Sequence, residues 1–431
     1  MNALVSWLPN LDRRVWILSF GRLLSQIGNG FTLFYAPIFF ANQVGLSATA
    51  VGIGIGSGSL SGVVGRFVGG SAADSPRWGR RKVILLSAAI SAIADVFLAT
   101  AFNFPSFVVG NLLMGLGIGL YWPATEAVVA DLTHGNQRNE AFAIARLADN
   151  LGLSLGIVLG GVLIELTSQY RLLFVIDGIT YGLFFCIVAI AITETLSTGD
   201  SHRQLFSGWG IALRDRQLWV FATVNVLFTM YLAQVQSTMP LYFSNVVSVG
   251  DDGTGFSPTR MSALFTWHVA LTALVQLPIA RWLNRVTHIR ALGLSLVFWG
   301  IGFIGIAATG MVTGGHLWWA IAALTILAIA TVTYLPSASS FVVALAPESL
   351  RGVYLSVNSQ CWALGYFIGP PLGGWALDQS TQVAHGFWLG LSCSGLLGLG
   401  IVTLLGRMNS SMSSSDSDLD SESDSSSSTD P

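Results

Sequence analysis

Four charged residues stand within otherwise apolar segments: Arg22, Glu126, Arg146 and Asp149. A charge in hydrocarbon costs several kcal/mol and usually faces a partner or a wet cavity. Arg22, Glu126 and Arg146 lie about 8–15 Å from the same end of their segments, at about 1.5 Å per residue. We therefore predict an ion cluster in which Glu126 or Asp149 takes up and releases a proton under the influence of an arginine. The alternative is permanent pairing of Arg22 with Glu126 and of Arg146 with Asp149, which would only hold helices together.

Polar and aromatic residues share helix faces with these charges. Gln26 and Asn29 follow Arg22 at helical spacing. The second half of the chain is uncharged at the equivalent places, where Asn225 replaces Arg22. The predicted cavity residues are Gln26, Asn29, Trp122, Asn225, Tyr231, Gln236, Trp267, His268, Tyr334, Asn358 and Trp362. A charged side facing an aromatic side suits an amphipathic or hydrophobic molecule, whereas helix packing is the alternative for the aromatic residues. For Asp95 and Asp177, on the third and sixth segments, packing is favoured over proton coupling.

The composition excludes a soluble globular protein. Of 431 residues, 52% are apolar and 10% are charged, against roughly 25% charged in a soluble domain. The 48 glycines and 14 tryptophans are typical of bilayer-spanning helices. The 3 cysteines all lie in apolar runs, and no spacing indicates a disulfide scaffold or a metal site. There is also no phosphate-binding Gly-Lys-Ser/Thr loop, so we predict no cofactor, no metal and no enzymatic activity.

Twelve segments are apolar and long enough to cross a bilayer, which takes about 20 residues. They lie near 16–40, 48–72, 83–104, 107–131, 140–166, 172–194, 217–247, 260–282, 289–312, 317–345, 353–377 and 384–406. We predict an all-α integral membrane protein with one six-helix bundle in 1–194, a linker with an interfacial helix in 195–216, and a second bundle in 217–407. The Ser/Asp-rich tail, 408–431, is too polar to form a core and is predicted to be disordered.

Basic residues gather on one side of these segments. With the N-terminus inside the cell, fifteen of the 20 lysines and arginines fall in cytoplasmic loops, and only Arg171 and Arg260 fall in outer loops. The positive-inside rule therefore predicts that both termini are cytoplasmic. The net charge of −2 is a cancellation between this basic body and the acidic tail.

The two halves of the chain repeat each other. Pro123, Arg138 and Glu165 match Pro336, Arg351 and Asp378 at a constant offset of 213 positions. The same offset relates the glycines Gly152, Gly156 and Gly160 to Gly365, Gly369 and Gly373, which we expect to pack helices. Trp16, Pro37, Phe40 and Asn42 match Trp219, Pro240, Phe243 and Asn245 at an offset of 203. Two repeats of the same orientation imply a two-fold axis along the membrane normal, with the working site between the halves.

One loop carries a further motif, which reads Gly70-Ser-Ala-Ala-Asp74-Ser-Pro-Arg77-Trp-Gly79-Arg80-Arg81. With this loop and its repeat, the chain resembles the major facilitator superfamily over roughly residues 12–407. In that family the loop latches the cytoplasmic side of the outward-facing state, together with an acidic residue at the end of the fourth span, which Asp131 matches. The resemblance implies a gate formed by Gly70, Asp74, Arg77, Gly79, Arg80, Arg81 and Asp131. The copy here has two extra residues between Asp74 and Gly79.

The resemblance also implies fold and function. The expected fold is twelve transmembrane helices in two six-helix bundles related by a pseudo-two-fold axis along the membrane normal. Pro123, Asp131, Arg138 and the glycine stripe resemble those of twelve-span drug/proton antiporter-like exporters, although Asn111 occupies the position of the arginine linked to proton coupling. We expect a monomeric secondary transporter of the inner or plasma membrane that alternates access and exports small amphipathic or hydrophobic molecules in exchange for protons. Its partners would be a small-molecule substrate, protons and the lipid bilayer, with no nucleic acid. The alternatives are uptake or facilitated diffusion of a sugar, organic acid or other nutrient, and a transport-dead membrane receptor or scaffold.

Overall fold

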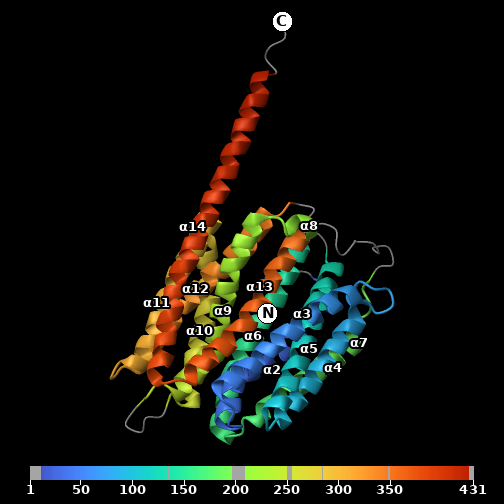
Figure 1. Ribbon diagram of the computed structural model, residues 1–431. Helices are drawn as coiled ribbons and strands as arrows, with labels where there is room; N and C mark the ends of the chain where they lie inside the picture. The colour runs from blue at the N-terminus through green and yellow to red at the C-terminus, as the bar shows by residue number, and fades with distance from the viewer. Residues whose placement is uncertain are drawn as a thin grey trace, which may run out of the picture.

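A computed structural model describes residues 11–133, 136–196, 209–249, 255–283, 285–347 and 350–426, with most side chains up to residue 408. Within these ranges the chain is helical almost throughout and forms no strand (Figure 1). The helices are α2 (Arg13–Asn42), α3 (Ala48–Ala73), α4 (Gly79–Thr100), α5 (Phe104–Asp131), α6 (Asn136–Thr167), α7 (Arg171–Ala191), α8 (Trp209–Ala212), α9 (Arg216–Asn245), α10 (Pro258–Leu283), α11 (His288–Met311), α12 (His316–Leu345), α13 (Arg351–Leu377) and α14 (Thr381–Ser426).

Each predicted apolar segment corresponds to a long helix. The predicted and observed helix ends differ by at most four residues, except at the C-terminal end of α14. Nine of the described helices are long and apolar enough to cross a membrane by length and composition. The other long helices are α2, α10 and α13. Of the predicted linker, α8 is described, whereas 197–208 lies outside the described residues. Of the predicted disordered tail, the structure describes 408–426 as the C-terminal part of α14, and 427–431 lies outside the described residues.

Side-chain caps fix where equivalent helices begin in the two repeats. Asp12 accepts a hydrogen bond from the backbone N–H of Arg14 (2.7 Å) at the start of α2. Asp215, 203 positions later, accepts from the N–H of Gln217 (2.8 Å) at the start of α9. Such caps satisfy amide groups that have no partner inside the helix. The Arg14 guanidinium, which also bonds to Asp12, lowers the pKa of that carboxyl and keeps the cap ionised.

The helices form two groups, which we call the N-terminal half (α2–α7) and the C-terminal half (α9–α14). Figure 1 shows them side by side, with α3, α4, α5 and α7 on the right and α10, α11, α12 and α14 on the left. Between the halves, α3 packs against α13, α6 against α10, and α2 against α9. We name the two ends of the bundle by a residue: α3 and α5 finish at the Asp74 end, and α2 and α9 finish at the Asn42 end.

Glycines let certain helices approach closely within each half. A Cβ built on Gly152 of α6 would come within 3 Å of the Leu23 carbonyl oxygen and of the Gln26 Cβ on α2. A Cβ on Gly365 of α13 would likewise meet the backbone of Thr229 and Met230 on α9. The repeat therefore places α6 on α2 and α13 on α9 through equivalent glycines, as expected for helix association without a hydrophobic driving force.

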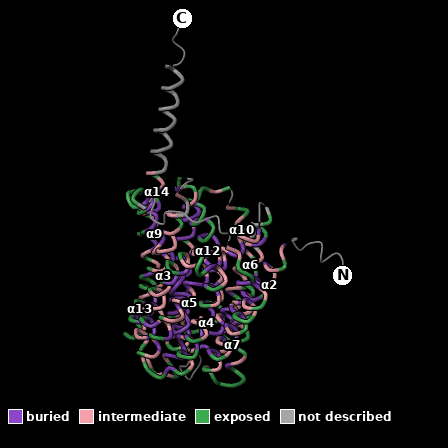
Figure 2. Tube along the Cα trace, turned by 90° about the vertical axis from the view of Figure 1, so that its right-hand side faces the viewer, coloured by how far each residue is buried: buried purple, intermediate pink, exposed green. Residues whose placement is uncertain are grey.

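The outer sides of the bundle expose large apolar side chains. Leu166, Ile190 and Trp318 are among the most exposed, at 78%, 87% and 74%. Figure 2 shows buried positions along the whole length of the bundle, alternating with intermediate and exposed ones. An apolar exterior over this length fits a protein surrounded by lipid rather than by water.

Candidate functional site

A cavity of about 320 Å³ lies between the two halves. Its walls come mainly from α2, α3 and α5 on one side and from α9 and α13 on the other. Most of the lining is apolar, and the polar groups on it include Asn29, Asn111, Gln236 and Tyr366. Arg66 is the charged residue among the described lining residues. The cavity is therefore suited to a largely apolar molecule with a few hydrogen-bonding groups.

Three of the residues predicted from the sequence line this cavity: Asn29, Gln236 and Trp362. Asn29 donates to Gln26 on the next turn of α2 (3.0 Å). Gln236 accepts a hydrogen bond from Tyr366 (2.7 Å), whose ring stacks near that of Trp362 with centroids 6.0 Å apart. Further polar side chains on the lining are those of Arg66, Asn111, Tyr366, Thr32, Ser59 and Ser237. Tyr366 follows Trp362 by one helical turn, a spacing that points to the same face.

Other predicted residues form a polar group inside the C-terminal half. Tyr334 donates to Asn225 (2.6 Å), and Asn225 donates to Asn358 (2.9 Å). Asn225 and Tyr334 are both fully buried. By the repeat offsets they correspond to Arg22 and Tyr121, so a neutral amide replaces a guanidinium beside the equivalent tyrosine.

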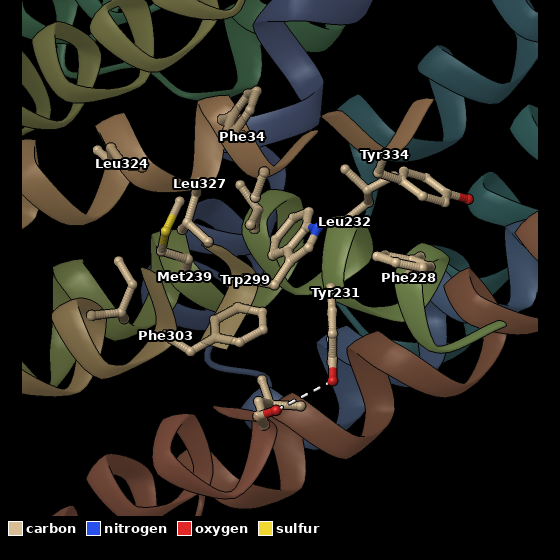
Figure 3. Close-up of a cluster of buried hydrophobic side chains, with 14 of the residues drawn as sticks. Phe34, Phe228, Tyr231, Leu232, Met239, Trp299, Phe303, Leu324, Leu327 and Tyr334 are labelled. Atoms are coloured by element: carbon tan, nitrogen blue, oxygen red, sulfur yellow. Dashed lines mark hydrogen bonds between the residues drawn. The ribbon is translucent and has the colours of Figure 1, made fainter. Parts of the chain in front are cut away.

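Tyr231, Trp267 and His268 lie away from the cavity lining. Tyr231 lies among Trp299 and Phe303 in the core of the C-terminal half (Figure 3). Its hydroxyl hydrogen-bonds to Ser394 (2.6 Å). Trp267 donates to Thr325 (2.9 Å), and the Nδ1 of His268 is 3.0 Å from the carbonyl oxygen of Leu324. These contacts join α10 to α12.

The four charged residues of the apolar segments meet at the Asp74 end of the N-terminal half. Arg22 donates to both carboxylate oxygens of Asp149, at 3.0 Å and 2.5 Å. Arg146 donates to Glu126 at 3.0 Å. The pairs are thus the reverse of the Arg22–Glu126 and Arg146–Asp149 pairs considered from the sequence. We refer to these four residues with Trp122 and Arg66 as the arginine cluster.

Trp122 lies between the two ion pairs. Its ring is 5.3 Å from the Arg22 guanidinium carbon and 5.1 Å from that of Arg146. Arg22 also lies 5.6 Å from the ring of Tyr121. Aromatic faces stabilise guanidinium groups that are removed from water. One predicted cavity residue, Trp122, therefore serves the arginine cluster rather than the cavity lining.

The two ion pairs differ in their access to water. The side chains of Arg22 and Asp149 are 1% and 9% exposed, whereas those of Arg146 and Glu126 are 59% and 40% exposed. Asp149 is thus held at both oxygens by a buried guanidinium, whereas Glu126 accepts one hydrogen bond from the described residues and has access to water.

Arg66 links the arginine cluster to the C-terminal half. Its guanidinium donates to the hydroxyl of Ser359 on α13 (2.9 Å). Glu126 acts electrostatically on Arg66 as well as on Arg22. Glu126 therefore lies under the influence of Arg22, Arg66 and its direct partner Arg146, one of which touches the other half.

The gate-motif residues assemble around Arg80. Its guanidinium donates to Asp74 (2.6 Å) and to Asp131 (2.8 Å). Glu194, which was not predicted from the sequence, accepts from the backbone N–H groups of Arg80 (3.0 Å) and Arg81 (3.2 Å). These contacts all lie within the N-terminal half.

The remaining gate residues have lesser roles in this structure. Gly79 has a φ of +74° in the left-handed region, and a Cβ there would meet the Glu194 carboxylate. Arg77 is exposed, and its carbonyl accepts from Lys82 (3.0 Å). Gly70 has open space around it.

Polar contacts join the two halves at the Asn42 end. The side-chain amides of Asn42 and Asn245 donate to each other's oxygens, at 2.9 Å and 2.8 Å. Asp378 of α13 accepts from the backbone N–H groups of Ala48 (2.8 Å) and Thr49 (2.8 Å) at the start of α3. Its repeat partner Glu165 accepts from Thr259 at the start of α10 (2.5 Å). We call these three contacts the Asn42-end latch.

The chain matches known families over most of its length. The sequence pattern of the Major Facilitator Superfamily matches residues 18–252 and 251–420. A Na(+), Li(+), K(+)/H(+) antiporter of Planococcus maritimus is 24% identical, covering 79% of this chain and 85% of the relative. The multidrug resistance protein MdtH of Photorhabdus laumondii is 24% identical (92% and 95% covered), and the quinolone resistance protein NorA of Staphylococcus aureus strain COL is 20% identical (90% and 96%).

Solved structures show the same fold. The nucleoside transporter NupG superimposes with a TM-score of 0.76 at 13% identity, covering 92% of this chain and 100% of that chain. A peptide transporter, POT, in complex with sulfate gives a TM-score of 0.75 at 13% identity, with 94% and 98% covered. At these identities the likeness concerns the fold alone.

Proposed function

Because this chain belongs to the major facilitator superfamily and is a membrane transporter, we propose that it exports small amphipathic or hydrophobic organic molecules in exchange for protons. The observation that carries the proposal is the arginine cluster beside the cavity, with one accessible carboxylate, Glu126, among three arginines. Relatives named for drug resistance and for proton antiport support the direction and the coupling.

Glu126 is the proton-exchanging group in this proposal, and Asp149 is its fixed neighbour. Glu126 is 40% exposed and bonded to Arg146, which is itself exposed. Asp149 is held at both oxygens by the buried Arg22. An acid that exchanges protons with water must reach water, and Glu126 meets this requirement better than Asp149.

Protonation of Glu126 changes the charge balance of the arginine cluster. With both acids ionised, three arginines face two carboxylates; with Glu126 neutral, three arginines face Asp149 alone. The added repulsion acts on Arg66, which is hydrogen-bonded to Ser359 of the other half (2.9 Å). The proton site thereby biases the contact between the halves, and coupling of this kind requires such a link.

The cavity supplies the substrate site. Apolar walls with the amides of Asn29, Asn111 and Gln236 suit a molecule that is mainly apolar and carries a few polar groups. The arginine distribution supports an orientation in which the Asp74 end and both termini are cytoplasmic. We propose a monomer in the bacterial plasma membrane.

The test is proton movement driven by substrate in liposomes that contain the purified protein. Candidate compounds are first chosen by the rise in melting temperature that they cause. Addition of a substrate to the lumen should then move protons in the opposite direction across the membrane. Glu126→Gln should abolish this proton movement while binding and expression persist, and full coupled transport in that variant would refute the role of Glu126. Glu140→Gln, which alters an exposed acid on α6, is the matched control and should transport normally.

A second function, uptake of a polar nutrient, is favoured by one feature of the cavity. Arg66 is the charged group among the described lining residues, and it suits an anionic or neutral polar solute better than a cation. The same liposomes decide between the two functions. Accumulation of a sugar, organic acid or similar solute along a proton gradient, rather than against it, would favour uptake.

A further inference from the structure

Two aspartates are buried together in the N-terminal half, apart from the arginine cluster. Asp95 on α4 and Asp177 on α7 are 1% and 0% exposed. Neither forms an ion pair in the part of the chain that the structure describes. Counted along their helices at about 1.5 Å per residue, both lie about 8–9 Å from the Asn42 end. Glu126 lies about as far from the opposite end.

The two side chains occupy the junction of α4, α7 and α2. The Cβ of Asp95 is close enough to α7 that a Cβ added to Gly178 would lie 3.3 Å from it. Asp177 points at α2, where Gly28 has no side chain and therefore leaves room for the carboxylate. Thr32, one turn further along α2, donates to Asp177 (3.1 Å).

Most of the oxygen atoms at this junction have no hydrogen-bond donor among the described residues. Both carboxylate oxygens of Asp95 and the Oδ1 of Asp177 are buried and without a partner. The hydroxyl of Ser91, one turn before Asp95, is buried and without a partner as well. The junction therefore holds three buried carboxylate oxygens that accept no hydrogen bond from the described residues.

The surrounding titratable and charged groups do not supply that donor. Tyr181 of α7 lies near both aspartates and also near Tyr121 of α5. Arg171, at the start of α7, is occupied by the carbonyls of Ala99 and Ala101 at the end of α4. On α2, the residues in contact are Gly28 and Thr32, which carry no charge.

Two ionised carboxylates side by side in so dry a place would combine desolvation with like-charge repulsion. A single proton removes one charge and provides an O–H donor between the two carboxyl groups. We propose that Asp95 and Asp177 together bind one exchangeable proton, at a site separate from Glu126. In this exchange the acid gives its proton to water in the cavity by way of the Thr32 hydroxyl, and a carboxylate remains.

Thr32 gives this site a route to the cavity. Its side chain lines the cavity and is hydrogen-bonded to Asp177. The acid pair therefore lies one hydroxyl group away from the space between the halves. If the proposed proton-coupled function holds, the N-terminal half carries a proton site near each end, with the cavity between them.

The experiment is a pH titration of the purified full-length protein by infrared difference spectroscopy, which detects the C=O stretch of protonated carboxyl groups. The wild type should show a band that disappears as the pH rises. Asp95→Asn and Asp177→Asn should each remove this band, and Glu140→Gln should keep it. The double variant should release one proton fewer per molecule than the wild type, and not two. Retention of the wild-type band in both single variants would overturn the proposal.

Asn is nearly isosteric with Asp and can donate the missing hydrogen bond, so the single variants should remain folded, which gel filtration checks. Thr32→Val should move the midpoint of the band without removing it. A midpoint that moves with sodium chloride but not with choline chloride would assign the pair to a metal cation and overturn the proton assignment. The titration uses neither substrate nor a gradient. A protein that titrates but shows no coupled flux would therefore refute the proposed function alone.

Discussion

The two ion pairs of the arginine cluster each join an arginine to a carboxylate, but the two arginines differ in how well they tolerate the loss of that partner. Arg22 is 1% exposed, so its charge depends on Asp149 and on the rings of Tyr121 and Trp122. Arg146 is 59% exposed, so water would still solvate its guanidinium if Glu126 were replaced. We therefore expect Asp149 to be required for stability, whereas the exposure of Glu126 fits the proton exchange that we propose for it.

We expect Asp149→Asn to destabilise the protein strongly, because the variant leaves the Arg22 charge buried without a counter-ion. The loss of one partner from a buried pair typically costs about 3–5 kcal/mol. Glu126→Gln should cost about 1 kcal/mol or less, since its partner is exposed. Thermal unfolding in detergent, followed by tryptophan fluorescence, measures both.

A paired change controls this prediction. Arg22→Met combined with Asp149→Leu removes both charges and should recover most of the stability that Asp149→Asn loses. Equal melting temperatures for Asp149→Asn and Glu126→Gln would contradict the difference between the two ion pairs.

At the residue scale, the sequence predicted which charges share a depth but not their partners. Arg22, Glu126, Arg146 and Asp149 were recognisable because charges are rare in apolar segments. The choice of partner depends on helix rotation and on Trp122, which separates the two pairs. Helical periodicity predicts the direction of a side chain around its helix axis only to within tens of degrees. That is too coarse to choose between acidic residues on neighbouring helices.

At the element scale, the glycines set which helices touch. Gly156 of α6 faces Ile27 and Gly30 of α2, where a Cβ would come within 3 Å of backbone atoms. Gly182 on α7 has nothing within 4 Å of the same added atom. Both positions are glycine in the sequence, and they differ only in which residues lie opposite them in the structure.

We expect Gly156→Ala to push α6 away from α2 and to lower stability by about 1–3 kcal/mol, the usual cost of overpacking. Gly182→Ala should be neutral or should stabilise α7 by up to about 1 kcal/mol, because alanine is the better helix former. Melting temperatures of the two variants in detergent test the pair. A similar loss in both variants would show that the close contact of Gly156 with α2 does not explain the effect.

The helix positions were predictable to within a few residues, whereas several contacts between elements were not. Hydropathy and the positions of Pro, Gly and charged residues mark helix ends, because helices in lipid must satisfy their own backbone groups. Glu194 was missed as a partner of the gate loop because it lies at the end of the predicted sixth segment and meets Arg80 only through folding. Tyr231 was expected in the cavity, but it faces the core of its own half, since polarity alone does not distinguish a wet face from a buried hydroxyl.

At the scale of the whole molecule, the repeat produces a symmetric closure at the Asn42 end. Asp378 and Glu165, 213 positions apart, each receive hydrogen bonds from the first residues of a helix in the opposite half. Carboxylates at helix N-termini are favoured by the helix dipole and by free amide groups. Toward the Asp74 end, the described hydrogen bonds between the halves include the one from Arg66 to Ser359. We infer that this conformation is closed at the Asn42 end and that the latch must break for that end to open.

We expect Asp378→Asn combined with Glu165→Gln to shift the molecule toward a state open at the Asn42 end. A cysteine placed at Ser237, a buried cavity-lining residue, reports this opening through its reaction with a membrane-impermeant maleimide, after Cys186, Cys361 and Cys393 are replaced by serine. Labelling should be several-fold faster in the double variant. Asp215→Asn removes a carboxylate cap within one half and should leave the rate unchanged; equal acceleration by this control would contradict the latch.

The same latch should respond to acid in a definite direction. Burial alone would raise the pKa of Asp378, but hydrogen bonds from the Thr49 side chain and from the first amides of α3 outweigh it, and its pKa lies below the ordinary value. Because its pKa is depressed, the ionised carboxylate of Asp378 stabilises the closed latch. This stabilisation is complete at pH values above the ordinary pKa, and it is lost as the pH falls through the lowered pKa. Labelling at Ser237→Cys should therefore accelerate in a sample briefly exposed below about pH 4, and much less so in Asp378→Asn, which has no carboxylate to protonate. Since the thiolate reacts more slowly in acid, rates are compared with a free cysteine peptide under the same conditions. An acid response of the same size in Asp378→Asn would place the sensor elsewhere in the molecule.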